Sequence, residues 1–184
     1  YGPMGTGGLI LGERVDPDRL KPLKQGGTGS RSEREEQPTF LPDRFESGTP
    51  NAVGLAGLNA GVRWLLAKGV EQVNAHECEL CQQLIDGLDT IAGVKVYGGL
   101  DARQQTATIA FNVHGLEPST VGLRLDEDYG ILCRVGLHCA PAAHRTLGTF
   151  PEGCVRFGLG ALTTSSEVRH AIEAVRELAR GKHG

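Results

Sequence analysis

Two cysteines, two histidines and an arginine lie close together in the segment CRVGLHCAPAAH, which covers positions 133 to 144. A thiol and an imidazole together can bind a metal ion, and a thiol near a cation can become a nucleophile because its pKa falls. His138 and Cys139 are adjacent, and Gly136 and Pro141 interrupt regular structure on either side of them. Three interpretations are open: a metal site, a reactive thiol, or a loop with a buried cysteine.

The other cysteines bear on this choice. Cys78 and Cys81 have the C-x-x-C spacing of a zinc half-site. Further ligands could come from Cys133, Cys139, His138 and His144. However, Cys78 and Cys81 fall inside a strongly periodic helical segment, whereas a turn is the usual frame for such a pair. We interpret them as helix residues and keep a non-enzymatic zinc-binding or redox module as the alternative of a different class.

The thiols differ in their expected exposure. Cys133 and Cys154 are flanked by apolar residues in predicted strands, so we expect both to be buried and inert. Cys139 follows a break in the strand pattern, and we expect it to be exposed. It is the candidate for a reactive thiol.

Composition limits the class of protein. The chain has 184 residues, 22% of them charged and 39% hydrophobic, with a net charge of -3, as in an ordinary globular protein. We expect no nucleic-acid or membrane partner, because there is no basic excess and no apolar run of about 18 residues. Five cysteines and no secretory signal argue against a disulfide framework and predict a cytoplasmic protein.

The elements that must position these residues fall into two parts. In the first part, we expect residues 1–8 to form a glycine-rich loop, 9–11 a short strand and 13–39 a long polar loop. This start predicts that the chain begins within a domain. Helix-start residues at 49–51 then precede two helices, which Gly69 separates.

From about residue 93 the pattern changes to β-β-α-β-β-α, which predicts a compact α+β unit. The expected strands are VKVYG, TATIAFNV, ILCRVG and CVRFGL. One helix has Pro118 in its first turn, and the last helix starts at Thr164 to Ser166 with Glu167 completing a capping box. The cysteine segment is a loop between the third and fourth strands.

Four segments together resemble the cysteine desulfurases: YGPMGTGG, FESGTPN, CRVGLHCAP and VRFGLGALTT. These are fold-type I, pyridoxal-phosphate (PLP) enzymes of the class V aminotransferase group, and the group II type is the most similar. The resemblance implies an α/β fold. Residues 1–92 would be the C-terminal end of the large PLP-binding domain, with a dimer loop and linking helices. Residues 93–184 would be the small domain with the catalytic cysteine loop.

The resemblance also implies roles for individual residues. Cys139 is the nucleophile that takes sulfur from L-cysteine as a persulfide, releasing L-alanine, before transfer to a sulfur-acceptor protein as in iron–sulfur cluster assembly. Arg156 binds the substrate carboxylate, and Arg134 and His138 lie near the substrate. Thr49 contacts the PLP phosphate of the partner subunit in a homodimer. Selenocysteine lyase, or another class V enzyme, is the alternative within the group.

In the family, the lysine that anchors PLP lies upstream of the segment that starts at Tyr1. The lysines of this chain do not match it in position: Lys21, Lys24, Lys68, Lys95 and Lys182. We therefore expect the chain to be the C-terminal portion of a longer enzyme and to be inactive alone.

Overall fold

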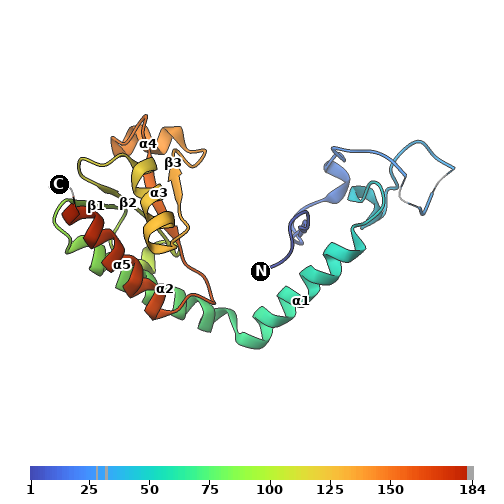
Figure 1. Cartoon of the computed structure of the whole chain (residues 1–184). Helices are drawn as coiled ribbons and strands as arrows, with labels where there is room; N and C mark the ends of the chain where they lie inside the picture. Colours follow the sequence, from blue (N-terminus) through green and yellow to red (C-terminus); the bar gives the residue numbers. More distant parts are fainter. Residues whose placement is uncertain (28, 32, 182–184) are drawn as a thin grey trace. The chain divides into compact units, whose positions relative to one another are not determined.

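The computed structural model describes residues 1–27, 29–31 and 33–181, and the chain divides into two compact units, residues 1–68 and 69–184 (Figure 1). Lys182 lies outside the described residues. Within the described part of the chain, none of the helices is long and apolar enough to cross a membrane.

Unit 1 (residues 1–68) is built around the helix α1, Ala52–Lys68. The side chain of Asn51 caps it, because its Oδ1 accepts a hydrogen bond from the Gly54 N–H (3.0 Å). The two short 3₁₀ helices of this unit are η1, Pro17–Arg19, and η2, Asp43–Phe45. The predicted helix start after residues 49–51 and the helix end before Gly69 are confirmed.

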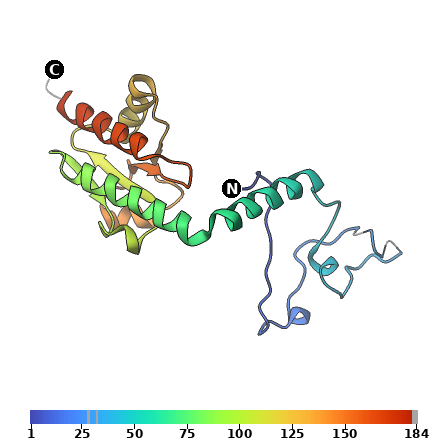
Figure 2. The same cartoon turned by 90° about the horizontal axis from the view of Figure 1, so that it is seen from below.

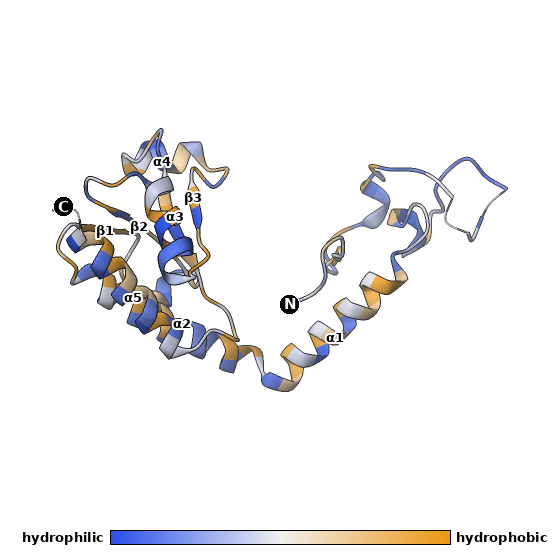
Figure 3. Ribbon diagram, in the orientation of Figure 1, coloured by the Kyte–Doolittle hydropathy of each residue, from blue (hydrophilic) through white to orange (hydrophobic). Residues whose placement is uncertain are grey.

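The loops of unit 1 agree with the sequence in one segment and differ in another. The polar segment 13–39 forms turns and η1 without strands in its described residues, as predicted. The predicted strand at Leu9–Leu11 is wrong, because these residues pair with no other strand and carry no regular secondary structure. Several apolar side chains of this unit are exposed, among them Met4, Val53 and Leu66. Hydrophobic and hydrophilic residues alternate along α1 in Figure 3, which is coloured by hydropathy.

Unit 2 (residues 69–184) contains a four-stranded antiparallel sheet in the order β1-β2-β4-β3. Its strands are β1, Val94–Tyr97; β2, Thr108–Val113; β3, Arg134–Gly136; and β4, Cys154–Gly158. Its helices are α2, Val70–Asp89; η3, Ala102–Gln104; α3, Pro118–Tyr129; α4, Pro141–Leu147; and α5, Ser165–Arg180. The helices α2 and α5 lie side by side (Figure 2).

One face of this sheet carries the hydrophobic core. Ile109, Phe111 and Val113 alternate along β2, and Val155 and Phe157 along β4, all on the same face and nearly inaccessible to solvent. The helices α2, α3 and α5 contribute the rest of the core. The residues between them, including Ala110, Asn112 and Arg156, lie on the opposite face, which is therefore free to carry polar groups.

Two details of unit 2 differ from the expected order. The predicted cysteine loop contains the helix α4, so the observed order is β-β-α-β-α-β-α. The strand β3 begins at Arg134 rather than at Ile131, because the Ile131 N–H donates to the Leu125 carbonyl (2.8 Å) and closes the end of α3. The capping box of Thr164 and Glu167 at the start of α5 is confirmed.

The compact units divide between Lys68 and Gly69, whereas the sequence placed a domain boundary after residue 92. The two divisions differ in where they place α2, which the sequence prediction groups with the first domain. Its buried side chains pack into the core of the sheet: Leu80, Cys81, Leu84, Ile85 and Leu88.

Candidate active site

Two arginines face each other across neighbouring strands on the polar face of the sheet. Arg134 of β3 and Arg156 of β4 are directly paired in the antiparallel register, which places their side chains on one face. Like charges in directly opposite positions are destabilising. Among the described residues, neither guanidinium has a carboxylate within 4.0 Å. This pair of unneutralised cations is suited to bind an anion, and a guanidinium fork matches a carboxylate.

The chain then turns sharply between β3 and α4, and Cys139 lies in this turn. The turn spans Leu137 to Ala140 and is closed by a hydrogen bond from the Ala140 N–H to the Leu137 carbonyl (2.8 Å). Its two central residues both have left-handed backbone angles, with φ of 50° at His138 and 59° at Cys139. Residues other than glycine adopt this region at a cost of roughly 1–2 kcal/mol each. The surrounding structure must hold the turn in place.

Two neighbours supply that support. Pro141 begins α4 immediately after the turn. On the other side, Gly153 lies so close to Gly136 that a Cβ at position 153 would be about 2.2 Å from the Gly136 backbone. The turn is therefore held on one side by the start of α4 and on the other side by the close packing of Gly136 against Gly153. Cys139 itself is exposed, as predicted.

His138 does not share the exposure of its neighbour. Its Nδ1 lies 3.9 Å from the Sγ of Cys154, which is buried. Burial lowers the pKa of the His138 imidazole, and the positive charges of Arg156 and Arg134 act in the same direction. A hydrogen bond with the Arg134 backbone opposes this lowering of the pKa, and the net direction favours the neutral ring.

The remaining predicted residue is in the other unit. Thr49 is exposed and lies three residues before the first residue of α1. Its hydroxyl and its place near a helix N-terminus suit a phosphate oxygen. Cys139, His138, Arg134 and Arg156 thus all belong to unit 2, whereas Thr49 belongs to unit 1.

Cys78 and Cys81 are helix residues of α2, as interpreted from the sequence. The Sγ of Cys81 is 3.6 Å from Gln105 Nε2 and 4.0 Å from the Thr106 carbonyl. Burial raises the pKa of this thiol. In the described part of the chain, the one group of three close metal-ligand side chains does not include either cysteine.

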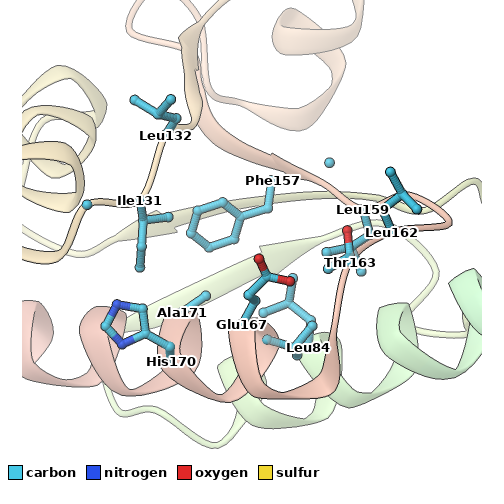
Figure 4. A pocket seen from close by; sticks show the side chains of 13 residues that line it. Leu84, Ile131, Leu132, Phe157, Leu159, Leu162, Thr163, Glu167, His170 and Ala171 are labelled. Atoms are coloured by element: carbon cyan, nitrogen blue, oxygen red, sulfur yellow. The ribbon is translucent and has the colours of Figure 1, made fainter. Parts of the chain in front are cut away.

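A cavity of about 440 Å³ lies elsewhere in unit 2, between the start of α5 and the strand β4 (Figure 4). Phe157, Ile131 and Ala171 give it a largely apolar wall. Its polar side chains have structural partners: Glu167 caps α5, and His170 Nε2 is 3.0 Å from the Tyr129 carbonyl. None of the predicted site residues lines this cavity.

The sequence interpretation missed one feature of the site. Cys154 was expected to be an inert core residue, and it is buried, but it lies on the polar face with His138 and His144. Its position in the alternation of β4, two residues before Arg156, was the available signal. Burial raises the pKa of Cys154, and the charge of Arg156 opposes that shift.

Comparison with known proteins gives a consistent family. Residues 1–170 match the aminotransferase class-V family. A probable cysteine desulfurase of Mycobacterium leprae is 33% identical over 183 residues, which cover 98% of this chain and 41% of that protein. A probable cysteine desulfurase of Methanothermobacter thermautotrophicus is 32% identical over 97% of this chain and 44% of its own length. The chain thus spans about two fifths of these relatives.

Solved structures match as well. The apo cysteine desulfurase of Thermococcus onnurineus is 35% identical, with a TM-score of 0.71 over 76% of this chain and 34% of that one. The cysteine desulfurase CsdA of Escherichia coli is 24% identical, with a TM-score of 0.73 over 90% of this chain and 40% of that one. The mixed α/β architecture, with its antiparallel sheet, is therefore that of a portion of these enzymes.

Proposed function

The chain belongs to the class V aminotransferase family, and from this premise we propose that it forms the nucleophile and carboxylate-binding part of a PLP-dependent cysteine desulfurase. The observation that carries the proposal is the pair Arg134 and Arg156, two facing cations on the sheet from which the Cys139 turn projects. A small amino acid carboxylate is an anion that would neutralise this pair.

The proposed reaction transfers sulfur from the substrate to the protein. The bond between carbon and sulfur of L-cysteine breaks, a sulfur–sulfur bond forms on Cys139, and a proton is delivered to the carbon, which gives L-alanine. The atoms balance, since L-cysteine and one thiol become L-alanine and one persulfide. PLP, when bound, supplies the electron sink that makes the carbon–sulfur bond labile.

The residues of this chain have separate tasks in the proposal. Arg156 and Arg134 hold the carboxylate and orient the substrate, while Cys139 supplies an exposed thiol on a turn of fixed backbone. Burial lowers the pKa of His138, which disfavours a further positive charge beside the two arginines. Thr49 fits a PLP phosphate through its exposed hydroxyl, and the family pattern assigns that phosphate to the partner subunit of a homodimer.

Two partners follow from the proposal. The exposed apolar side chains of unit 1, such as Val53 and Leu66, support an interface between copies of the protein. The exposed position of Cys139 supports transfer of the persulfide sulfur to an acceptor protein, because such an acceptor must reach the thiol directly.

The test is a sulfur adduct on one thiol. In the full-length protein with PLP, Cys139→Ala is expected to abolish persulfide formation from L-cysteine while PLP stays bound, as followed by mass spectrometry and PLP absorbance. Cys133→Ala is the matched control, since Cys133 lies just before β3 and is half-buried. It is expected to keep the adduct. A persulfide on Cys78 or Cys133 in the unmodified protein would refute the assignment.

A further inference from the structure

Three metal-ligand side chains converge beneath the Cys139 turn. His138 comes from the turn, His144 from α4 and Cys154 from the first residue of β4. His144 and Cys154 are buried, with 4% and 2% of their surface exposed. In the described part of the chain this is the one group of three such residues with ligand atoms close together.

The spacing of the three ligand atoms is near that of a bound ion. All three lie within 4.8 Å of one another, and the Cys154 Sγ is 3.9 Å from His138 Nδ1. In a tetrahedral zinc site, with bonds of about 2.0–2.1 Å to nitrogen and about 2.3 Å to sulfur, ligand atoms are roughly 3.3–3.7 Å apart. The separations between ligand atoms therefore need to shorten by at most about 1.5 Å.

The orientation of His144 is fixed in the manner of a metal-binding histidine. Its Nδ1 is 2.7 Å from the Oγ1 of Thr149, which is itself buried. The Thr149 hydroxyl also lies 3.5 Å from the His144 carbonyl, and we assign its proton to that carbonyl, so that its oxygen accepts from Nδ1–H. This tautomer leaves Nε2 with a free lone pair. Metal-binding histidines almost always donate their second nitrogen to a fixed acceptor in this way.

His138 provides an independent indication of a missing ligand. Its Nε2 is buried and has no hydrogen-bond partner in the described residues. The contact of its Nδ1 with the Cys154 Sγ is long, and a thiol is a weak hydrogen-bond partner. Buried polar atoms are normally paired. The ring nitrogens are thus incompletely paired, and an ion bound at Nδ1, the atom nearest the Cys154 thiol, would give the ring one strong interaction.

We propose that His138, His144 and Cys154 form a binding site for a zinc ion, with a fourth coordination position left open. Two nitrogen donors and one sulfur donor favour zinc over magnesium or calcium, which prefer oxygen. Binding replaces the Cys154 thiol proton with the ion, and the proton passes to solvent. The inference goes beyond the proposed function and does not depend on it. An ion in this site would hold the turn that carries Cys139.

The test uses the reduced, metal-free chain without PLP or cysteine. Zinc alone is expected to bind at one ion per chain, as measured by calorimetry and elemental analysis. Cobalt(II), as a spectroscopic substitute, is expected to give a thiolate charge-transfer band. His144→Ala and Cys154→Ala should each weaken zinc binding at least tenfold and remove that band. Cys133→Ala and Cys78→Ala are the matched cysteine controls and should retain both.

X-ray absorption on the unmodified zinc-loaded chain keeps the test valid if a variant fails to fold. One sulfur at about 2.3 Å and two nitrogens at about 2.0–2.1 Å are expected. A shell with two sulfurs, no zinc binding, binding of copper but not zinc, or affinity unchanged in both folded variants would overturn the proposal. Because no substrate is present, these outcomes are separate from the persulfide test.

Discussion

The facing arginines of β3 and β4 favour one kind of ligand, because two cations in a cross-strand pair are stabilised best by an anion that contacts both. A guanidinium offers parallel N–H groups to the two oxygens of a carboxylate, whereas an ammonium group is a point charge. The contribution of Arg156 should therefore depend on the shape of its side chain as well as on its charge.

Arg156→Lys in the full-length enzyme is expected to raise KM for L-cysteine at least about tenfold, because a charge-assisted hydrogen bond is worth roughly 1.5–3 kcal/mol. The thermal midpoint should change little, since the charge and the stem remain. Steady-state kinetics with a melting curve measure both effects. Arg124→Lys is the matched control, because Arg124 is paired with Asp128 on the surface of α3. An unchanged KM in Arg156→Lys would move the carboxylate role to Arg134.

The exposure of a single residue could be predicted from the sequence where it depends on the local pattern of the chain. The exposure of Cys139 followed from the break in the strand pattern around Gly136 and Pro141, and it is confirmed. The role of Cys154 could not be predicted in the same way. Strand alternation indicates which face a residue occupies, but which side chains cover that face depends on the path of the chain after the strand.

At the scale of elements, the position of the Cys139 turn depends on how closely β3 approaches the residue before β4. Gly153 has φ of 82°, and a Cβ there would overlap the Gly136 backbone. Backbone cannot move aside as a flexible side chain can. A side chain at position 153 would therefore push away the end of β3, and with it the turn from Leu137 to Ala140.

Gly153→Ala is expected to lower the free energy of unfolding by about 3 kcal/mol. About 1–2 kcal/mol comes from the left-handed backbone and a further 1–3 kcal/mol from overpacking. Gly158→Ala, at the last residue of β4, is the matched control, since a Cβ there meets no atom within 4 Å. It should be neutral or slightly stabilising. Urea unfolding followed by circular dichroism compares the two, and equal stabilities would contradict the role of this close approach.

The helix α4 shows why the cysteine segment was predicted as a loop. It has seven residues, too few for an apolar period to be visible. Its boundaries were nevertheless marked, by Pro141 at its first position and by Gly148 in the left-handed conformation after its last residue. The long helix α5 was easier to predict, because its capping box marks where it starts and its apolar residues recur at helical spacing along it.

At the scale of the whole molecule, the sequence indicated how many elements there are better than how they are grouped. The apolar face of α2 was visible as a period of 3.6 residues, and that period predicts burial without naming the partner surface. The structure supplies the partner, since α2 packs against the sheet and α5 within unit 2. The boundary at residue 93 follows the change from helical to strand pattern, whereas the compact units follow the packing of α2 and divide before it.

This grouping predicts how truncated chains behave. Residues 69–184 are expected to unfold cooperatively with a midpoint close to that of the whole chain, because the hydrophobic core lies within them. Residues 93–184 lack Leu80, Leu84, Ile85 and Leu88, four aliphatic side chains that are at most 3% exposed. Each is worth about 1.5–3 kcal/mol, so their loss removes roughly 6–12 kcal/mol. That is comparable to the whole stability of a typical domain, about 5–15 kcal/mol.

Thermal unfolding and the binding of a dye for exposed apolar surface compare the two truncated chains. A variant of residues 69–184 with Glu79→Ala, an exposed position of α2, is the control for changes in the helix that leave the core intact. Cooperative unfolding of residues 93–184 at the same midpoint would show that α2 is not part of the folding unit.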